Sequence, residues 1–284
     1  MNEAAPSRTA LRVAVRRAAH QILDHPVVFE DALALSMIGA EEASKLKSLA
    51  LRPETMGSPG LRAFLAVRSR FAEDELTKAV DQGVTQYVVL GAGLDTFAYR
   101  SPLLHTGLKV FEVDHPATQQ WKRDQLRASG IAVPSGVVFV PVNFESQDLK
   151  QALEQAGFQM DERTCFSWLG VAPYLTGRAF DETLSFIAAM PEGSGVVFDY
   201  AVSRSSLNAA EQRAFDLLAD RVAAEGEPFQ LFFEPEELAQ RLRRIGFRHI
   251  EDLGGAQLNA RYLPGRQDGL QIRGNLGHLV SARV

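Results

Sequence analysis

The sequence predicts an α/β fold in which a doubly wound, mostly parallel sheet of about seven strands follows an N-terminal helical cap. After residue 83, short apolar runs alternate with segments of helix length, as expected for parallel strands that are buried on both faces and joined by crossover helices. Before that residue, apolar side chains recur at helical spacing between turn residues.

Residues 1–82 are expected to form the cap and a lead-in helix. The first helix, residues 9–23, ends before His25-Pro26, because a residue that precedes proline avoids the helical region. Its apolar side chains share one face, and the other face is expected to carry Arg12, Arg16 and Arg17. Further helices are expected at residues 31–38, 41–49 and 61–80.

Residues 83–284 are expected to form the core of the sheet, with a C-terminal loop on the substrate side. Strands are predicted at residues 87–90, 108–113, 137–142, 165–171, 196–200, 247–253 and 277–284, and the last of them is a candidate for antiparallel pairing. Helices are predicted at residues 117–128, 147–156, 180–190 and 234–245, and residues 258–271 read as a loop. Without a linker rich in Pro, Gly or Ser, one domain over residues 1–284 is expected.

Charge, cysteine content and hydropathy disfavour several classes of protein. Thirty Lys and Arg against thirty-five Asp and Glu give a net charge of −5, which disfavours a nucleic-acid partner. The single Cys165 excludes an internal disulfide, and no CxxC pair or other cluster suggests a metal site. Neither an apolar leader nor a run of about 20 apolar residues is present, so no membrane partner is expected. We expect a soluble, cytoplasmic enzyme whose oligomeric state the sequence does not indicate.

The strongest functional signal is a glycine turn followed by an acidic strand end. The first predicted strand runs into Gly91 and Gly93, and glycine lets the backbone turn tightly against a ligand. Asp114 ends the next strand, about 20 residues later, where a ribose-binding carboxylate belongs. Thr96 replaces the third glycine of a dinucleotide fingerprint, which favours a nucleoside. The alternative is a simple strand-to-helix turn with Asp114 as a helix cap.

Several motifs resemble one known family. They are Arg68-Ser69-Arg70-Phe71, VLGAGLDTFAYR at residues 89–100, FEVDHP at 111–116 and SWLGVAPYLT at 167–176. They resemble the leucine carboxyl methyltransferase family, in particular its bacterial branch similar to the tetracenomycin polyketide carboxyl methyltransferase. The likeness runs from residue 7 to residue 266. It implies a class I, Rossmann-like methyltransferase that uses S-adenosylmethionine (SAM).

The resemblance also implies roles for cofactor-binding residues. Gly91 and Gly93 would face the methionyl part of SAM, Asp114 the ribose, and Arg68 the methionyl carboxylate. Asn143, followed by Phe144, stands where the family has an Asp that accepts the adenine amino group, and an amide oxygen accepts without charge. Leu169 stands where many relatives carry Glu, so one cofactor contact of the family is absent.

Candidate catalytic and substrate residues follow the fourth and the last strands. Tyr174, after the fourth strand, is the candidate for orienting the acceptor or the SAM amino group, with a core tyrosine as the alternative. Arg261, Tyr262 and Arg266 lie in the predicted C-terminal loop, where a guanidinium can hold an acceptor carboxylate or simply tie the loop down. A carboxylate acceptor is ionised at pH 7 and needs no general base.

Four functions remain open at this point. The leading one is a SAM-dependent O-methyltransferase that methylates a carboxylate of a small, polyketide-like molecule or a peptide C-terminus. The second is methylation of a hydroxyl in secondary metabolism, which would benefit from a base near the oxygen. His115 is available, but it is expected to start the next helix instead. The third is a nicotinamide-dependent oxidoreductase, which Thr96 argues against. The fourth is a non-catalytic SAM-binding protein, because Asn143 and Leu169 depart from the family pattern.

Overall fold

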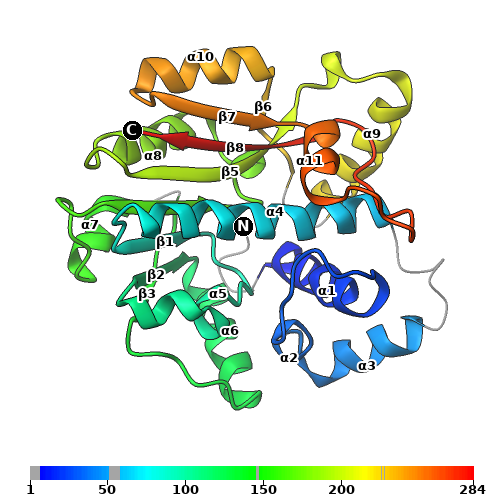
Figure 1. The fold of residues 1–284 in the computed structure, drawn as a ribbon, viewed down its shortest axis with the longest axis horizontal. Coiled ribbons are helices and arrows are strands. Elements are labelled where there is room, and N and C mark those ends of the chain that lie inside the picture. Colours follow the sequence, from blue (N-terminus) through cyan, green and yellow to red (C-terminus); the bar gives the residue numbers. More distant parts are fainter. Residues whose placement is uncertain (1–6, 51–57, 145–146, 225, 227) are drawn as a thin grey trace.

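The fold is built on one mixed sheet (Figure 1). The computed structural model describes residues 7–50, 58–144, 147–224, 226 and 228–284. Within them the eight-stranded sheet has the order β3-β2-β1-β4-β5-β8-β7, with β6 paired to β5 beside this path. The strands are β1 (Gln86–Leu90), β2 (Lys109–Asp114), β3 (Val137–Pro141), β4 (Thr164–Trp168), β5 (Gly195–Val202), β6 (Phe232–Phe233), β7 (His249–Leu253) and β8 (Gly277–Arg283).

The predicted fold class is confirmed. Strands β1 to β5 pair in parallel, whereas β8 runs antiparallel to both β5 and β7. Each of the seven predicted strands is present, and the antiparallel pairing of the last one is confirmed. The two-residue β6 was not predicted, because a segment this short carries no periodic signal.

Helices cover both faces of the sheet. One apolar layer joins the sheet to α7 (Leu149–Gln155), α8 (Gly177–Ala188) and α10 (Pro235–Ile245) through side chains such as Phe166 and Phe180. The opposite face packs on α4 (Pro59–Asp81), α5 (Phe97–Arg100) and α11 (Gly255–Tyr262). Figure 1 shows α4 lying across the sheet, so the predicted lead-in helix is part of this helical layer.

The remaining helices form the cap and flank the sheet. The helices α1 (Arg8–Leu23), α2 (Ala34–Met37) and α3 (Gly39–Ala50) share an apolar cluster with Leu94 of the glycine turn and with α6 (Pro116–Ala128). The cap is therefore packed directly on the segment after β1. The shorter 3₁₀ turns are η2 (Pro102–Thr106), η3 (Ala172–Tyr174) and η4 (Arg204–Ser206).

Three helices were not predicted from the sequence: α9, α11 and the four-residue α5. Helix α9 (Ala209–Ala223) begins with a capping box between Asn208 and Glu211, a signal that is present in the sequence. The prediction that residues 258–271 form a loop is wrong in its first part, because α11 extends to Tyr262. That helix starts after Gly254 without a side-chain cap, so no local start signal marks it.

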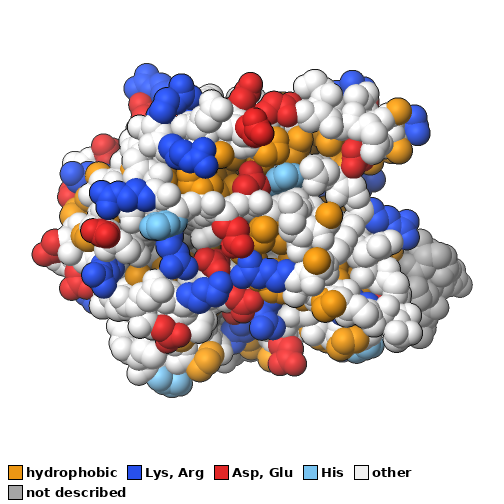
Figure 2. Space-filling view, turned by 45° about the horizontal axis from the view of Figure 1, so that its top comes forward, with side chains coloured by type: hydrophobic (Ala, Val, Ile, Leu, Met, Phe, Trp, Pro, Cys, Tyr) orange, Lys and Arg blue, Asp and Glu red, His pale blue; other side chains and the backbone are white. Residues whose placement is uncertain are grey.

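No described helix combines the length and the apolar character needed to cross a membrane. Acidic and basic side chains are interspersed on the face shown in Figure 2 and do not form separate fields of one sign.

A buried polar cluster fastens the end of α1 to α4. Asp24 accepts two hydrogen bonds from the Arg62 guanidinium, at 2.7 and 2.8 Å, and both side chains are buried. His20 Nδ1 lies 2.8 Å from Asp24, and its Nε2 accepts from the Val28 amide at 3.0 Å, so the proton is on Nδ1. Burial alone raises the pKa of Asp24, but the bonds from Arg62 and His20 hold that pKa below its ordinary value.

Replacing Arg62 by methionine is expected to lower the free energy of unfolding by about 3–5 kcal/mol, because the Asp24 carboxylate stays buried without its cation. Urea unfolding of the variant at pH 7 measures this loss. The double variant Arg62→Met, Asp24→Asn is expected to regain most of it. If Arg62→Met were as stable as the wild type, the Arg62–Asp24 pair would not stabilise the fold as expected.

The same cluster predicts a pH dependence. The folded state favours ionised Asp24, so its contribution to stability is complete above the ordinary Asp pKa of about 3.9 and is lost as the pH falls below it. Unfolding free energies measured between pH 3 and pH 7 are expected to fall less steeply toward acid in the double variant than in the wild type.

Candidate active site

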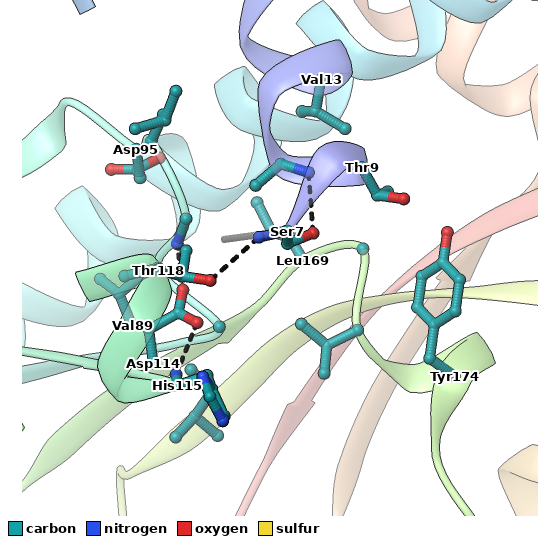
Figure 3. Close-up of a pocket in the computed structure, with 18 of the residues that line it drawn as sticks. Ser7, Thr9, Val13, Val89, Asp95, Asp114, His115, Thr118, Leu169 and Tyr174 are labelled. Atoms are coloured by element: carbon teal, nitrogen blue, oxygen red, sulfur yellow. Dashed lines mark hydrogen bonds between the residues drawn. The ribbon is translucent and has the colours of Figure 1, made fainter. Parts of the chain in front are cut away.

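A cavity of about 260 Å³ opens where β1, β2 and β4 end. Strand β1 lies between β2 and β4, so the chain order reverses at this point, which is where open parallel sheets bind ligands. Seven of the predicted site residues line the cavity: Arg68, Gly91, Gly93, Asp114, Asn143, Phe144 and Tyr174. Figure 3 shows the cavity from one side.

The turn after β1 requires glycine at two positions. Gly91 and Gly93 have φ values of +66° and +45°, in the left-handed region that other residues avoid. A Cβ on Gly91 would lie 2.3 Å from the Val171 side chain, and one on Gly93 would lie 3.3 Å from Ala10. The turn can therefore lie this close to Val171 and to Ala10 of α1 only because both side chains are absent.

Asp114 is held at the end of β2 by backbone donors. One carboxylate oxygen accepts from the Gly93 amide at 2.5 Å, and the other accepts from the His115 amide at 2.7 Å. Burial raises the pKa of Asp114 from its ordinary value, and these two hydrogen bonds act in the opposite direction. Each oxygen keeps a second lone pair, so the carboxylate can still accept from two ligand hydroxyls.

The amino end of α1 covers the cavity. Ser7 caps the helix by accepting from the Ala10 amide at 3.1 Å, and its own amide donates to Thr118 of α6 at 3.2 Å. Thr9 and Val13, on the next turn, face the same cavity (Figure 3). The sequence analysis had assigned this helix to the cap without a place in the site.

Arg17 was expected on the face of α1 opposite its apolar side chains, and this expectation is wrong. The side chain is buried, lines the cavity and donates to the Leu94 carbonyl at 2.5 Å. Its Nε lies 2.9 Å from Asp31, which also accepts from Thr96 at 2.7 Å. Helical spacing puts Arg17 on the same face as the buried Ala14, three residues earlier, but it does not show whether an arginine on that face is buried and paired.

Arg68 reaches the cavity from α4 and is paired at the same time. Its Nη1 donates to Asp199 of β5 at 2.8 Å, and both side chains are buried. The other Asp199 oxygen accepts from the Gly170 amide at 2.5 Å, in the turn after β4. The sequence analysis found Arg68 but not Asp199.

The turn after β4 supplies the other wall. Leu169, Val171 and Tyr174 line the cavity, and the Tyr174 hydroxyl is directed toward the side on which Thr9 lies (Figure 3). The Tyr174 ring packs on Phe229 with the centroids 5.2 Å apart. Gln230 donates to the carbonyl of Tyr174 at 2.8 Å, so the segment before β6 supports this turn.

Asn143 and Phe144 lie at the end of β3, beside the Asp114 end of the cavity. The Asn143 amide donates to the Gln147 side chain at 2.8 Å, which fixes the backbone of this turn. His115 is the cap of α6, since its Nδ1 accepts from the Ala117 amide at 3.3 Å. The prediction that His115 starts a helix is confirmed.

The three residues predicted to contact substrate lie outside the lining of the cavity. Arg261 pairs with Glu251 at 3.2 Å, and Tyr262 donates to Asp74 at 3.2 Å. Arg266 bonds Asp268 and donates to the Pro26 carbonyl at 2.6 Å. These contacts match the alternative that the residues tie their segment to the body of the protein.

The sequence analysis predicted no metal site, and it stays a prediction. The described residues contain no group of three or more His, Cys, Asp or Glu side chains arranged to hold a metal ion.

Replacing Gly91 by alanine is expected to destabilise the fold by about 2–5 kcal/mol, because left-handed strain adds to a collision with Val171. The matched control is Gly107→Ala: Gly107 has φ +87° but no atom within 4 Å of an added Cβ, so only strain applies there. Urea unfolding of both variants separates the two terms. Equal losses would show that the close approach of Val171 is unimportant.

Comparison with known proteins agrees with this geometry. The family model for leucine carboxyl methyltransferase matches residues 10–188. A putative SAM-dependent methyltransferase of Bacillus subtilis (strain 168) is 32% identical over 285 residues, which cover 93% of each chain. One from Mycolicibacterium paratuberculosis is 30% identical over 276 residues, covering 89% of this chain and 85% of that protein.

Solved structures share the fold. A putative methyltransferase from Thermobifida fusca superposes with a TM-score of 0.62 at 17% identity, over 99% of this chain and 95% of the other. A protein of the DUF574 family from Streptomyces avermitilis gives a TM-score of 0.54 at 14% identity, covering 94% and 96%. The particular bacterial branch stays a prediction. Because the family model spans more than half of the sequence and the Bacillus relative aligns over nearly all of it, the chain belongs to the leucine carboxyl methyltransferase family.

Proposed function

We propose that this protein transfers the methyl group of SAM to a carboxylate oxygen of a small molecule or a peptide C-terminus. The chain is a methyltransferase of the leucine carboxyl methyltransferase family, and relatives along its whole length are named as SAM-dependent enzymes. The methyl acceptor, and its being a carboxylate rather than a hydroxyl, are inferred from the residues of the site.

The cavity suits a nucleoside with a charged tail. Asp114 keeps free lone pairs for the two ribose hydroxyls, and the glycine turn lines the cavity, where the methionyl chain would lie. Asn143, Phe144 and Arg68 all line the cavity; the first two are proposed to flank the adenine, and Arg68 to meet the methionyl carboxylate. SAM supplies an electrophilic methyl group on a sulfonium, and the protein's part is to hold donor and acceptor in line.

The proposal of a carboxylate acceptor rests on the contacts that the candidate general bases of the cavity already make. Among the described lining residues, Asp95, Asp114 and His115 each accept a backbone N–H, at 2.7–3.3 Å. The second Asp95 oxygen lies 3.7 Å from Arg17, and the lone pairs that Asp114 keeps are assigned here to the ribose hydroxyls. A hydroxyl acceptor would need one of them as a general base, whereas a carboxylate is ionised at pH 7. Its attack on the sulfonium methyl forms a neutral ester and a neutral thioether, and a wall with Leu169 and Val171 favours this loss of charge.

Tyr174 is proposed to orient the acceptor. Its ring is supported by Phe229, and its hydroxyl is directed into the cavity opposite the SAM-binding turn (Figure 3). A hydroxyl there can donate to the carboxylate oxygen that does not attack, which aligns the other oxygen with the methyl group. Arg261, Tyr262 and Arg266 are not part of this proposal, because they lie outside the lining.

Methyl transfer to a carboxylate is expected to give an alkali-labile product. The protein is incubated with methyl-labelled SAM and matched panels of apolar carboxylic acids and phenols, and the labelled products are treated with mild alkali. Label released as methanol supports an ester. An alkali-stable product would show hydroxyl methylation instead, and Asp114→Ala serves as the inactive control.

Replacing Asp114 by asparagine is expected to weaken SAM binding by about 10- to 100-fold, because charged acceptors bind hydroxyls more strongly than amides. Calorimetric titration measures the dissociation constant. In the wild type the affinity is expected to fall as the pH is lowered, since protonation removes an acceptor. The fall begins at a higher pH than for an ordinary aspartate, because burial raises the pKa of Asp114. The asparagine variant should lack this dependence, and a wild type with pH-independent affinity would contradict the ribose role.

A further inference from the structure

Arg68 is held from behind by a carboxylate that does not itself line the cavity. Asp199 lies on β5, and 6% of its surface and 6% of that of Arg68 are exposed. The Nη1 of Arg68 donates to one Asp199 oxygen at 2.8 Å, whereas the buried Nε has no hydrogen-bond partner among the described residues. Two buried charges are therefore paired, but the guanidinium still has donors to spare.

The second oxygen of Asp199 extends this arrangement to the turn after β4. It accepts from the Gly170 amide at 2.5 Å, and Gly170 has φ +72°. A Cβ at Gly170 would lie 3.0 Å and 3.2 Å from Nη1 and Nη2 of Arg68. The guanidinium thus lies against the backbone of the turn, and its plane is fixed on one side by Asp199 and on another by Gly170.

A charge held in this way is preorganised. An unpaired arginine side chain must lose rotamer freedom when it binds an anion, and a guanidinium fixed beforehand has already lost it. Arg68 lines the cavity, and Asp199 accepts from only one of its five N–H groups, so the guanidinium keeps donors for that anion. Asp199 supplies the fixed geometry without touching the ligand.

We propose that Asp199 is a positioning residue, which aims the Arg68 guanidinium at the carboxylate of the methionyl group of the methyl donor. This inference rests on the proposed function, since it assumes that Arg68 meets that carboxylate. It differs from a purely structural role in one respect: it acts only on ligands that carry the carboxylate.

Two ligands separate these roles. S-adenosylhomocysteine has the amino-acid carboxylate, and 5′-deoxy-5′-methylthioadenosine lacks the whole amino-acid group. In Asp199→Asn the amide oxygen can still accept from Gly170, but the charge that holds Arg68 is gone. Calorimetry is expected to show at least tenfold weaker binding of S-adenosylhomocysteine and no change beyond about twofold for methylthioadenosine. Asp216→Asn, which removes the charge from an exposed pair with Arg204, is the matched control and should change neither.

A double-mutant comparison tests whether the effect passes through Arg68. Arg68→Met is expected to weaken S-adenosylhomocysteine selectively, and adding Asp199→Asn to it should cause no further loss. The double variant removes both buried charges, so it is measurable even if Asp199→Asn alone does not fold. Weaker binding of the double variant than of Arg68→Met, or equal losses for both ligands in Asp199→Asn, would overturn the inference.

The outcome also distinguishes this inference from the proposed function. A folded wild-type protein that ignores S-adenosylhomocysteine contradicts the proposed function. A wild type that binds it, with an Asp199→Asn variant that binds it equally well, contradicts only the role of Asp199.

Discussion

The hydrogen bond from the Gly93 amide to the Asp114 carboxylate is the contact on which the candidate site depends. It joins the ends of two neighbouring parallel strands, β1 and β2, and it forms only because the glycine turn brings its amide within 2.5 Å of the carboxylate. The two groups complement each other, since both are partly buried and the carboxylate needs a donor where the amide needs an acceptor. Strand pairing, turn conformation and carboxylate position are thus one arrangement and not three independent features.

The cap completes that arrangement from the other side. Thr96 stands where a dinucleotide-binding turn would have its third glycine, and here its hydroxyl donates to Asp31 in the cap. Arg17 bridges the same aspartate and the carbonyl of Leu94. Position 96, where a glycine would allow close packing of a helix on its strand, here attaches the glycine turn to the cap. The first helix of the chain is therefore part of the site.

The sequence predicted what local patterns determine. Strands buried on both faces appear as apolar runs such as residues 87–90, and the glycine turn with Asp114 carries its spacing in the chain. Partners that meet only after folding were missed: Asp199 lies 131 residues from Arg68, and Arg17 lies 77 residues from Leu94. Periodicity cannot distinguish a buried, paired arginine from a solvated one, and a helix that begins without a cap, like α11, has no signal at its start.

The position of β8 between β5 and β7 has a consequence for how the chain is made. During translation β7 is synthesised before β8, which is its only pairing partner among the described strands. Until residues 277–283 leave the ribosome, β5 lacks its antiparallel partner along the whole length of the strand. The nascent protein thus carries two open strand edges, which is the state in which unfinished sheets are most exposed to wrong pairing. Closure of the sheet is a late event, after most of the nucleoside site has been synthesised.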